Sequence, residues 1–145
     1  MSKRQKLKNN TWKWMAKYIK LRDAVSDHLD PDYRYVKCRT CPKVLERGTK
    51  DCQGGHYLGR GLGGGSGTYF DERNVHTQCS QCNRFRQGAP EEMELYIIEK
   101  YGIEVIEELK LKHKVESYSN EEIEALGMYY KDMYQSLLKE YNIKR

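Results

Sequence analysis

Residues 79–83 are Cys79-Ser80-Gln81-Cys82-Asn83, and residues 38–41 are Cys38-Arg39-Thr40-Cys41. Each segment places two thiols three positions apart, so a tight turn can direct both sulfur atoms toward one point. Two such pairs supply the four thiolates that suit one tetrahedral Zn²⁺ ion. The sequence therefore predicts a structural zinc site with Cys38, Cys41, Cys79 and Cys82 as its ligands. A four-thiolate site is closed and keeps no position for a reacting water.

The rest of the chain offers a thin hydrophobic core. Of its 145 residues, 38% are hydrophobic and 32% are charged. This length predicts a single domain over 1–145, and a structural metal stabilises small cores. Nothing resembles a signal peptide or a membrane span of about 20 apolar residues, so we expect a cytoplasmic protein with no membrane partner. In that reducing compartment, paired cysteines bind metal rather than form disulfides. Cys52 lacks a paired cysteine and is expected to be a small buried or strand residue.

Charge divides the chain into unequal parts. Residues 1–37 carry ten Lys/Arg against four Asp/Glu, a net charge of +6, and residues 38–90 carry eight against four, a net charge of +4. Residues 91–145 carry eight against thirteen, a net charge of −5. The first 90 residues are expected to bind DNA phosphates, with a merely solvated surface as the alternative. Three parts follow: a basic N-terminal helix (1–30), a zinc-bound core (33–90) and an acidic helical tail (91–145).

The N-terminal part is predicted to be a helix that begins at an N-cap Thr11 and ends near Asp27, after a frayed segment 1–10. Its apolar face combines four residues at helical spacing: Trp14, Tyr18, Leu21 and Val25. A second stripe consists of Lys13, Lys17 and Lys20. These lysines either contact phosphate or form a solvated face.

The central part is predicted to contain short strands. One covers Tyr33–Lys37, a turn region covers Pro42–Lys50, and a second strand over Asp51–Leu58 carries His56. A glycine-rich loop, 59–67, is either mobile or close to a ligand. Another strand is expected to begin at Tyr69-Phe70, and 74–78 to turn into a helix that starts near Cys79.

The C-terminal third is predicted to be helical. Pro90 suits a first helical position and Gly102 a helix stop, and a second helix covers about Ile103–Lys112. Ser119 and Glu122 match a capping box for a third helix, to about Tyr141. Its apolar face consists of Ile123, Leu126, Tyr130, Met133, Leu137 and Tyr141, and packs on the N-terminal helix or in a homodimer. The fold class is α+β.

The span between the two cysteine pairs holds groups suited to phosphodiester chemistry. His56 follows two glycines, and an imidazole with an unperturbed pKa near ~6.5 suits a general base. Asn83 directly follows a zinc ligand, so its amide is held rigidly, and Asn74 can brace the loop. Arg60, Arg84 and Arg86 can clamp phosphate. His76 has several candidate roles, of which a structural hydrogen bond is favoured; His28 and His113 are expected at the surface.

Gly55-His56-Tyr57, the run from Phe70 to Asn83, and Gly88 resemble the phage NinG (Rap) recombination endonucleases. The similarity covers roughly residues 11–140 and is most specific from Asn74 to Asn83. That family lies within the His-Asn-His, or ββα-metal, nucleases. The resemblance implies a zinc-stapled treble-clef core flanked by helices, with His56, Asn74 and Asn83 at the family's His and Asn positions.

The resemblance further implies a structure-selective DNA endonuclease that cuts branched or single-strand-containing DNA, such as displacement loops and Holliday junctions, and meets recombination proteins in the host cytoplasm. His56 would activate water, while Mg²⁺ or Mn²⁺ bound by Asn83 and a carboxylate stabilises the leaving oxygen. The chain departs from the pattern at Gly55 and Gln53, where acidic residues are usual. Asp51, Gln53 and Asp71 are the candidate replacements.

Two other readings remain open at the level of sequence. One is a zinc-ribbon module that binds DNA without cutting it, which explains the cysteines and the basic half but not Asn74 and Asn83. The other is an adaptor whose acidic tail recruits recombination partners. Metal-dependent nicking distinguishes the endonuclease from both.

Overall fold

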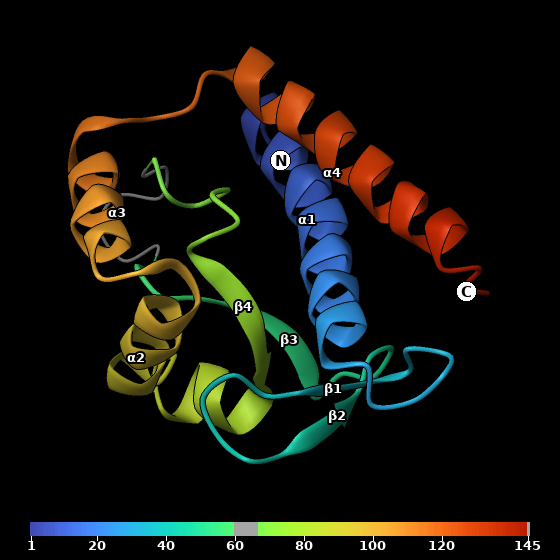
Figure 1. Cartoon of the computed structure of the whole chain (residues 1–145). Coiled ribbons are helices and arrows are strands. Elements are labelled where there is room, and N and C mark those ends of the chain that lie inside the picture. Colours follow the sequence, from blue (N-terminus) through green and yellow to red (C-terminus); the bar gives the residue numbers. More distant parts are fainter. Residues whose placement is uncertain (60–66, 145) are drawn as a thin grey trace.

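The computed structural model describes residues 1–59 and 67–144 and confirms the α+β class. The elements in chain order are α1 (Lys3–Asp27), β1 (Tyr35–Lys37), β2 (Val44–Glu46), β3 (Cys52–His56), β4 (Val75–Cys79), a π-helix (Gln81–Phe85), α2 (Pro90–Tyr101), α3 (Glu104–Val115) and α4 (Asn120–Glu140). In Figure 1, α1 and α4 lie on one side of the β3–β4 pair, and α2 and α3 lie on the other.

The N-cap of helix α1 lies nine residues before the predicted N-cap, Thr11. Ser2 is the N-cap, and its hydroxyl accepts a hydrogen bond from the Gln5 amide at 3.1 Å. The expectation that residues 1–10 fray was wrong, because Leu7 packs against the core and Arg4 donates to Asn120 at 2.9 Å. Long-range packing extends this helix beyond the apolar stripe visible in the sequence.

Helices α1 and α4 run parallel, with their N-terminal ends together (Figure 1). The Thr11 side chain is buried between them and donates to the Ile123 carbonyl at 2.7 Å, so this residue joins helices rather than capping one. A Cβ atom at Gly127 would lie 2.8 Å from the Thr11 hydroxyl, so glycine permits the close approach. The capping box of Ser119 with Glu122 is confirmed, as is packing of the α4 apolar face on α1. Tyr141 is the exception, because it lies after the end of α4 and is exposed.

The strands form two antiparallel pairs. Strand β1 pairs with β2, with Val36 opposite Leu45, and β3 pairs with β4, with Cys52 opposite Cys79. The predicted turn region at 42–50 therefore contains a strand. Tyr69-Phe70 lies in a turn rather than a strand, and 75–79 is the strand that the sequence analysis assigned to a turn. All five β4 residues are buried, so this strand lacks the alternating pattern of a half-exposed one.

The chain leaves β4 through an unusual backbone. The helix expected near Cys79 is a π-helix that begins at Gln81, and three left-handed residues follow it: Gln87 (φ 54°), Gly88 (φ 86°) and Ala89 (φ 45°). Helix α2 then begins at Pro90 and is followed by Gly102 (φ 98°), as predicted. Helix α3 extends to Val115, three residues beyond the predicted end.

A buried carboxylate fastens α1 to the strands. Asp23, fully buried, accepts hydrogen bonds from the Thr77 amide at 3.0 Å and hydroxyl at 2.8 Å, and forms ion pairs with Arg22 and Arg39. Burial alone would raise the Asp23 pKa, but the two guanidinium groups outweigh it and lower the pKa. Because Arg39 lies within the first cysteine pair, this network places α1 beside the cysteines.

Candidate functional site

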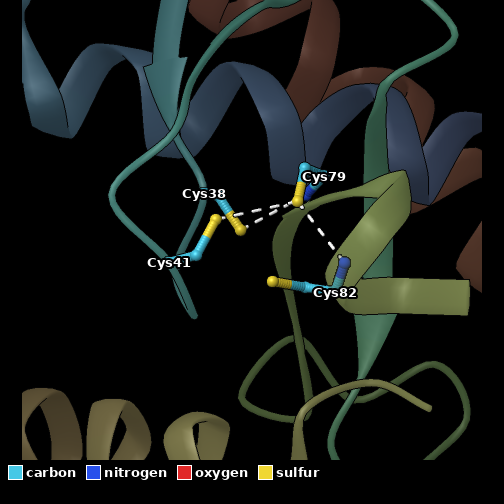
Figure 2. A group of neighbouring side chains, drawn as sticks. All are labelled: Cys38, Cys41, Cys79 and Cys82. Carbon is cyan, nitrogen blue, oxygen red and sulfur yellow. Dashed lines mark hydrogen bonds between the residues drawn. The ribbon is translucent and has the colours of Figure 1, made fainter. Parts of the chain in front are cut away.

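The four predicted zinc ligands converge on one point. Cys38 and Cys41 come from the loop between β1 and β2, Cys79 ends β4, and Cys82 lies in the π-helix (Figure 2). Their sulfur atoms all lie within 4.8 Å of one another, and Cys41 and Cys79 are 3.7 Å apart. Sulfur atoms about 2.3 Å from a shared Zn²⁺ ion lie about 3.8 Å apart in a tetrahedron. The cluster can hold a metal ion such as zinc.

Hydrogen bonds favour the thiolate form of Cys38, whereas burial raises the pKa of Cys41 to about 12 and also raises the pKa of Cys79. Cys38 accepts from the Cys79 amide at 3.3 Å, and Cys82 accepts from the Arg86 guanidinium at 3.5 Å. Burial opposes ionisation of Cys38, but the Thr40 hydroxyl and the Cys79 amide outweigh it and lower the pKa of Cys38 to about 7. A thiolate is the form that binds zinc. These residues therefore fit a structural zinc ion, which would tie the β1–β2 loop to the end of β4.

Cys52 is not part of this cluster. Its side chain is buried in the first position of β3, as expected, and burial raises the pKa of its thiol to about 11. It is therefore a neutral packing residue.

An open cavity of about 550 Å³ lies between α1, β3 and the π-helix. Its described lining contains two cations, Lys20 and Arg84, and no carboxylate. The other lining residues are Trp12, Ala16, Cys52, Gln53, Gly54, His56, Gly59, Asn83, Gln87 and Gly88. The cavity thus brings together His56, Asn83 and one predicted arginine, in surroundings that attract anions.

The His56 ring is fixed from two directions. Its Nε2 lies 2.9 Å from the backbone carbonyl oxygen of Tyr69. The Trp12 indole stacks on the imidazole, with ring centroids 4.8 Å apart and planes inclined by 23°. A carbonyl oxygen only accepts hydrogen bonds, so Nε2 carries the proton and the basic lone pair of the neutral ring is on Nδ1.

Asn83 is held by its position as well as by a hydrogen bond. It directly follows the zinc ligand Cys82, and its side-chain amide donates to Oε1 of Gln53 at 2.9 Å. Gln53 in turn donates to the Lys50 carbonyl at 3.0 Å. The two amide side chains therefore form one fixed pair in the cavity wall.

The candidate carboxylates lie elsewhere. Asp51 accepts from the Ser80 amide and forms an ion pair with Lys43, and Asp71 forms ion pairs with Arg73 and Lys112. Neither carboxylate lines the cavity. Among its described lining residues, the cavity therefore offers a second, harder cation only side-chain amide oxygens and an imidazole, which is a poor match for a carboxylate-bound Mg²⁺.

Asn74 braces both ends of the glycine-rich segment, as the sequence suggested. Its fully buried side chain accepts from the Leu58 amide at 2.8 Å and donates to the carbonyls of Leu58 and Thr68 at 3.1 and 3.0 Å. The predicted phosphate clamp Arg60 lies outside the described residues. Asn74 therefore acts on the backbone that leads into and out of that segment.

Comparison with known proteins shows which family the chain belongs to. The model of the family described as "Bacteriophage Lambda NinG protein" matches residues 1–140. The chain belongs to the NinG family. Similar curated proteins are the NinG proteins of Salmonella phage P22, 37% identical over 71 residues, and of Escherichia phage lambda, 32% identical over 71 residues.

These alignments cover 49% of the chain and 33% of each relative, so the matched part spans one third of the length of the relatives. No solved structure matches the chain. Among the described residues of this NinG-family chain, every helix is too short or too polar to cross a membrane.

The predicted DNA-binding cations of this NinG-family chain occupy three environments. Lys13 and Lys17 are exposed on α1, whereas Lys20 is half-buried in the cavity, 3.5 Å from the Cys52 carbonyl. Arg84 lines the cavity. Arg86 forms an ion pair with Glu92 and a hydrogen bond to a cysteine, so it lies beside the cluster rather than on an open phosphate-binding face.

The remaining histidines are placed by their contacts. His76, fully buried, contacts the Arg73 carbonyl at 2.7 Å and the Arg22 guanidinium at 3.1 Å, which is the structural arrangement that was favoured. His28 is exposed at the end of α1. His113 differs from the expected surface residue, because it is half-buried and lies 2.9 Å from the Thr68 hydroxyl.

Trp12 is the site residue that the sequence analysis missed. It lies off the predicted apolar stripe of α1 that begins at Trp14. In the structure it lines the cavity and also packs against the edge of the hydrophobic core. An aromatic residue outside the core stripe of an amphipathic helix was the available signal.

Proposed function

We propose that this NinG-family chain is a DNA endonuclease that hydrolyses phosphodiester bonds in the cavity. The observation that carries the proposal is the position of His56. Its ring is fixed by Tyr69 and Trp12 in a cavity that also contains Lys20 and Arg84. A fixed imidazole beside two cations combines a base with an anion-binding surface.

His56 is the proposed general base. With the proton of the neutral ring on Nε2, Nδ1 takes a proton from a water molecule, and that water attacks phosphorus. The resulting imidazolium keeps its hydrogen bond to the Tyr69 carbonyl, which stabilises the positive charge. General-base catalysis contributes about 10²–10⁴-fold to a rate.

Lys20 and Arg84 are the proposed phosphate-binding groups. Both line the cavity from opposite elements, Lys20 from α1 and Arg84 from the π-helix. A guanidinium binds two phosphate oxygens at once, and both cations stabilise the charge that develops in the transition state. The zinc ion would have a structural role, since its four thiolates leave no coordination position for substrate.

A requirement for Mg²⁺ or Mn²⁺ remains part of the proposal. Such an ion stabilises a leaving oxygen as a Lewis acid, and Asn83 is the residue that would contact it. Because no carboxylate lines the described cavity, no step of the proposed mechanism passes through that ion. Branched recombination intermediates are the proposed substrates, on the basis of family membership and the basic first 90 residues.

The test compares cleavage of a Holliday junction, a displacement loop and a linear duplex of matched sequence in Mg²⁺, Mn²⁺ and EDTA. The zinc-loaded protein should nick the branched substrates preferentially in a divalent metal. His56→Ala should lower the rate at least about 10²-fold while leaving DNA affinity nearly unchanged. His28→Ala, at the exposed end of α1, is the matched control. Full activity of a folded His56→Ala protein would contradict the assignment.

One observation favours a second candidate, a DNA-binding module without catalysis. The described cavity lining contains no carboxylate, whereas a tightly bound Mg²⁺ ion usually has one or two. A wild-type protein that binds branched DNA but never cuts it, in either metal, would establish this alternative.

A further inference from the structure

We propose that Lys13, Lys17 and Lys131 form a second anion site, around the ring of Trp14, that binds the phosphate backbone of nucleic acid. The site lies outside the cavity and includes a residue of α4. The identity of its occupant rests on the proposed function, because a protein that acts on DNA must hold phosphates beyond the one that reacts.

The geometry is a convergence of three ammonium groups on one indole. Lys13 and Lys17 of α1 lie 5.1 and 5.2 Å from the centroid of the Trp14 ring. Lys131 approaches the same ring from α4, at 5.3 Å. Each contact is within the ~6 Å range of a cation–π interaction. Any two of the three ammonium nitrogens are therefore no farther apart than about twice this cation–π range.

These three charges have no partner of opposite sign among the residues that the structure describes, since none of them forms an ion pair there. Other described lysines do form ion pairs: Lys43 with Asp51, and Lys112 with Asp71. Lysines four positions apart on one helix repel each other, and Lys131 adds a third charge. A bound anion would relieve this repulsion.

The surrounding helix surface supports nucleic acid as the occupant. From Lys3 to Arg22, α1 carries lysines and arginines and no acidic residue. Helix α4 belongs to the part of the chain with a net charge of −5, outside the first 90 residues that were expected to bind DNA phosphates. Lys131 is one of the eight lysines and arginines of that part, and its ammonium group lies over the Trp14 ring that α1 presents.

The position of the cluster relative to the cavity is set by α1. Trp12 and Lys20 of this helix line the cavity, whereas Trp14 packs on the α4 side against Tyr134, with ring centroids 6.2 Å apart. Figure 1 shows α1 between the β3–β4 pair and α4. Since a helix with its side chains is about 10–12 Å across, one nucleic-acid segment can contact both sites across α1.

The experiment measures binding of the full zinc-loaded chain to a fluorescent forked DNA in EDTA, so that no cleavage is needed. Lys131→Gln should lower affinity by about 5–10-fold at ~0.1 M salt and reduce the slope of log K against log salt by about 1. Lys13→Gln should act similarly. Lys139→Gln, also on α4, is the matched control. Unchanged melting temperatures show that the variants fold.

Four outcomes are informative. Loss of affinity in the Lys131→Gln and Lys13→Gln proteins, with none in Lys139→Gln, supports the site even if the wild-type protein never cuts DNA. Affinities of all three variants equal to that of a DNA-binding wild type overturn the site and leave the proposed function standing. A wild type that binds no DNA overturns both. If Lys131→Gln weakens binding of polyglutamate but not of DNA, the occupant is an acidic protein and the inference is overturned.

Discussion

A Cβ atom at Gly55 would lie 1.7 Å from Oε1 of Gln78. The Gln78 side chain cannot move aside at low cost, because it is fully buried and its amide donates to the Thr40 hydroxyl at 3.0 Å and the Gly88 carbonyl at 2.8 Å. The resemblance inferred from the sequence led us to expect an acidic residue at the position before His56. In this chain Gln78 occupies the space that such a side chain would need.

The first prediction follows from this contact. Gly55→Ala should lower the free energy of unfolding by about 1–3 kcal/mol, the usual cost of overpacking a tight site, as measured by urea unfolding with zinc present. Gly48→Ala is the control, because a Cβ atom there has no neighbour within 4 Å. Adding Gln78→Ala to Gly55→Ala should recover part of the loss attributable to the clash. Equal stability of the Gly55→Ala and Gly48→Ala proteins would contradict the contact.

The second prediction concerns the cysteine cluster. Cys79→Ser should abolish tight zinc binding and unfold the central region, because metal binding and folding are coupled in such sites. Elemental analysis and circular dichroism measure the two effects. Cys52→Ala tests specificity, since this buried cysteine lies outside the cluster. Retention of one zinc per chain by the Cys79→Ser protein would show that the ligand set is wrong.

The third prediction is a pH dependence of stability. Burial and the neighbouring Arg22 lower the pKa of His76 to about 3. The unfolded chain therefore takes up a proton near pH ~6.5 while the folded chain does not, so stability should fall as the pH drops from 6.5 toward 3. The slope is at most about 1.4 kcal/mol per pH unit.

His76→Gln isolates this contribution from that of the thiolates, which also bind protons in acid. The unfolding free energies of wild type and variant, measured from pH 7 to 5, should converge as the pH falls. A constant difference across that interval would mean that His76 does not titrate as its burial implies.

The fourth prediction concerns Trp12, which positions the His56 ring. If the chain cleaves DNA, Trp12→Ala should lower the cleavage rate with a smaller effect on DNA affinity, because the imidazole loses the ring stacked on it. Trp12→Phe retains an aromatic surface and should recover most of the rate. Single-turnover cleavage and binding in EDTA separate the two effects. Equal rates for the Ala and Phe variants would remove the positioning role.

Much of the fold was predictable from local chemistry. The cysteine spacing, the capping box at Ser119 and the stop at Gly102 each have a mechanism that acts within a few residues. Strand β4 was missed because all five of its residues are buried, so it lacks alternation. The start of α1 was missed because contacts with α4, more than a hundred residues away, extend that helix.

The residues of the candidate site were likewise predicted from the sequence only in part. His56 and Asn83 were identified from their positions next to glycine and a zinc ligand, and the cavity brings them together. Asp51 and Asp71 were the predicted metal-binding carboxylates, but neither lines the cavity. Each forms an ion pair outside it, Asp51 with Lys43 and Asp71 with Lys112. Ion pairs between distant segments, such as that of Asp71 with Lys112, leave no local sequence signal.

The Asn74 side chain has a consequence for how this protein can vary. One amide joins the backbone at Leu58 to that at Thr68, so the two ends of the intervening segment are fixed independently of what lies between them. Doubling the length of such a segment costs only about 0.6 kcal/mol in closure entropy. We therefore expect this chain to accept insertions between residues 59 and 67 without displacement of His56.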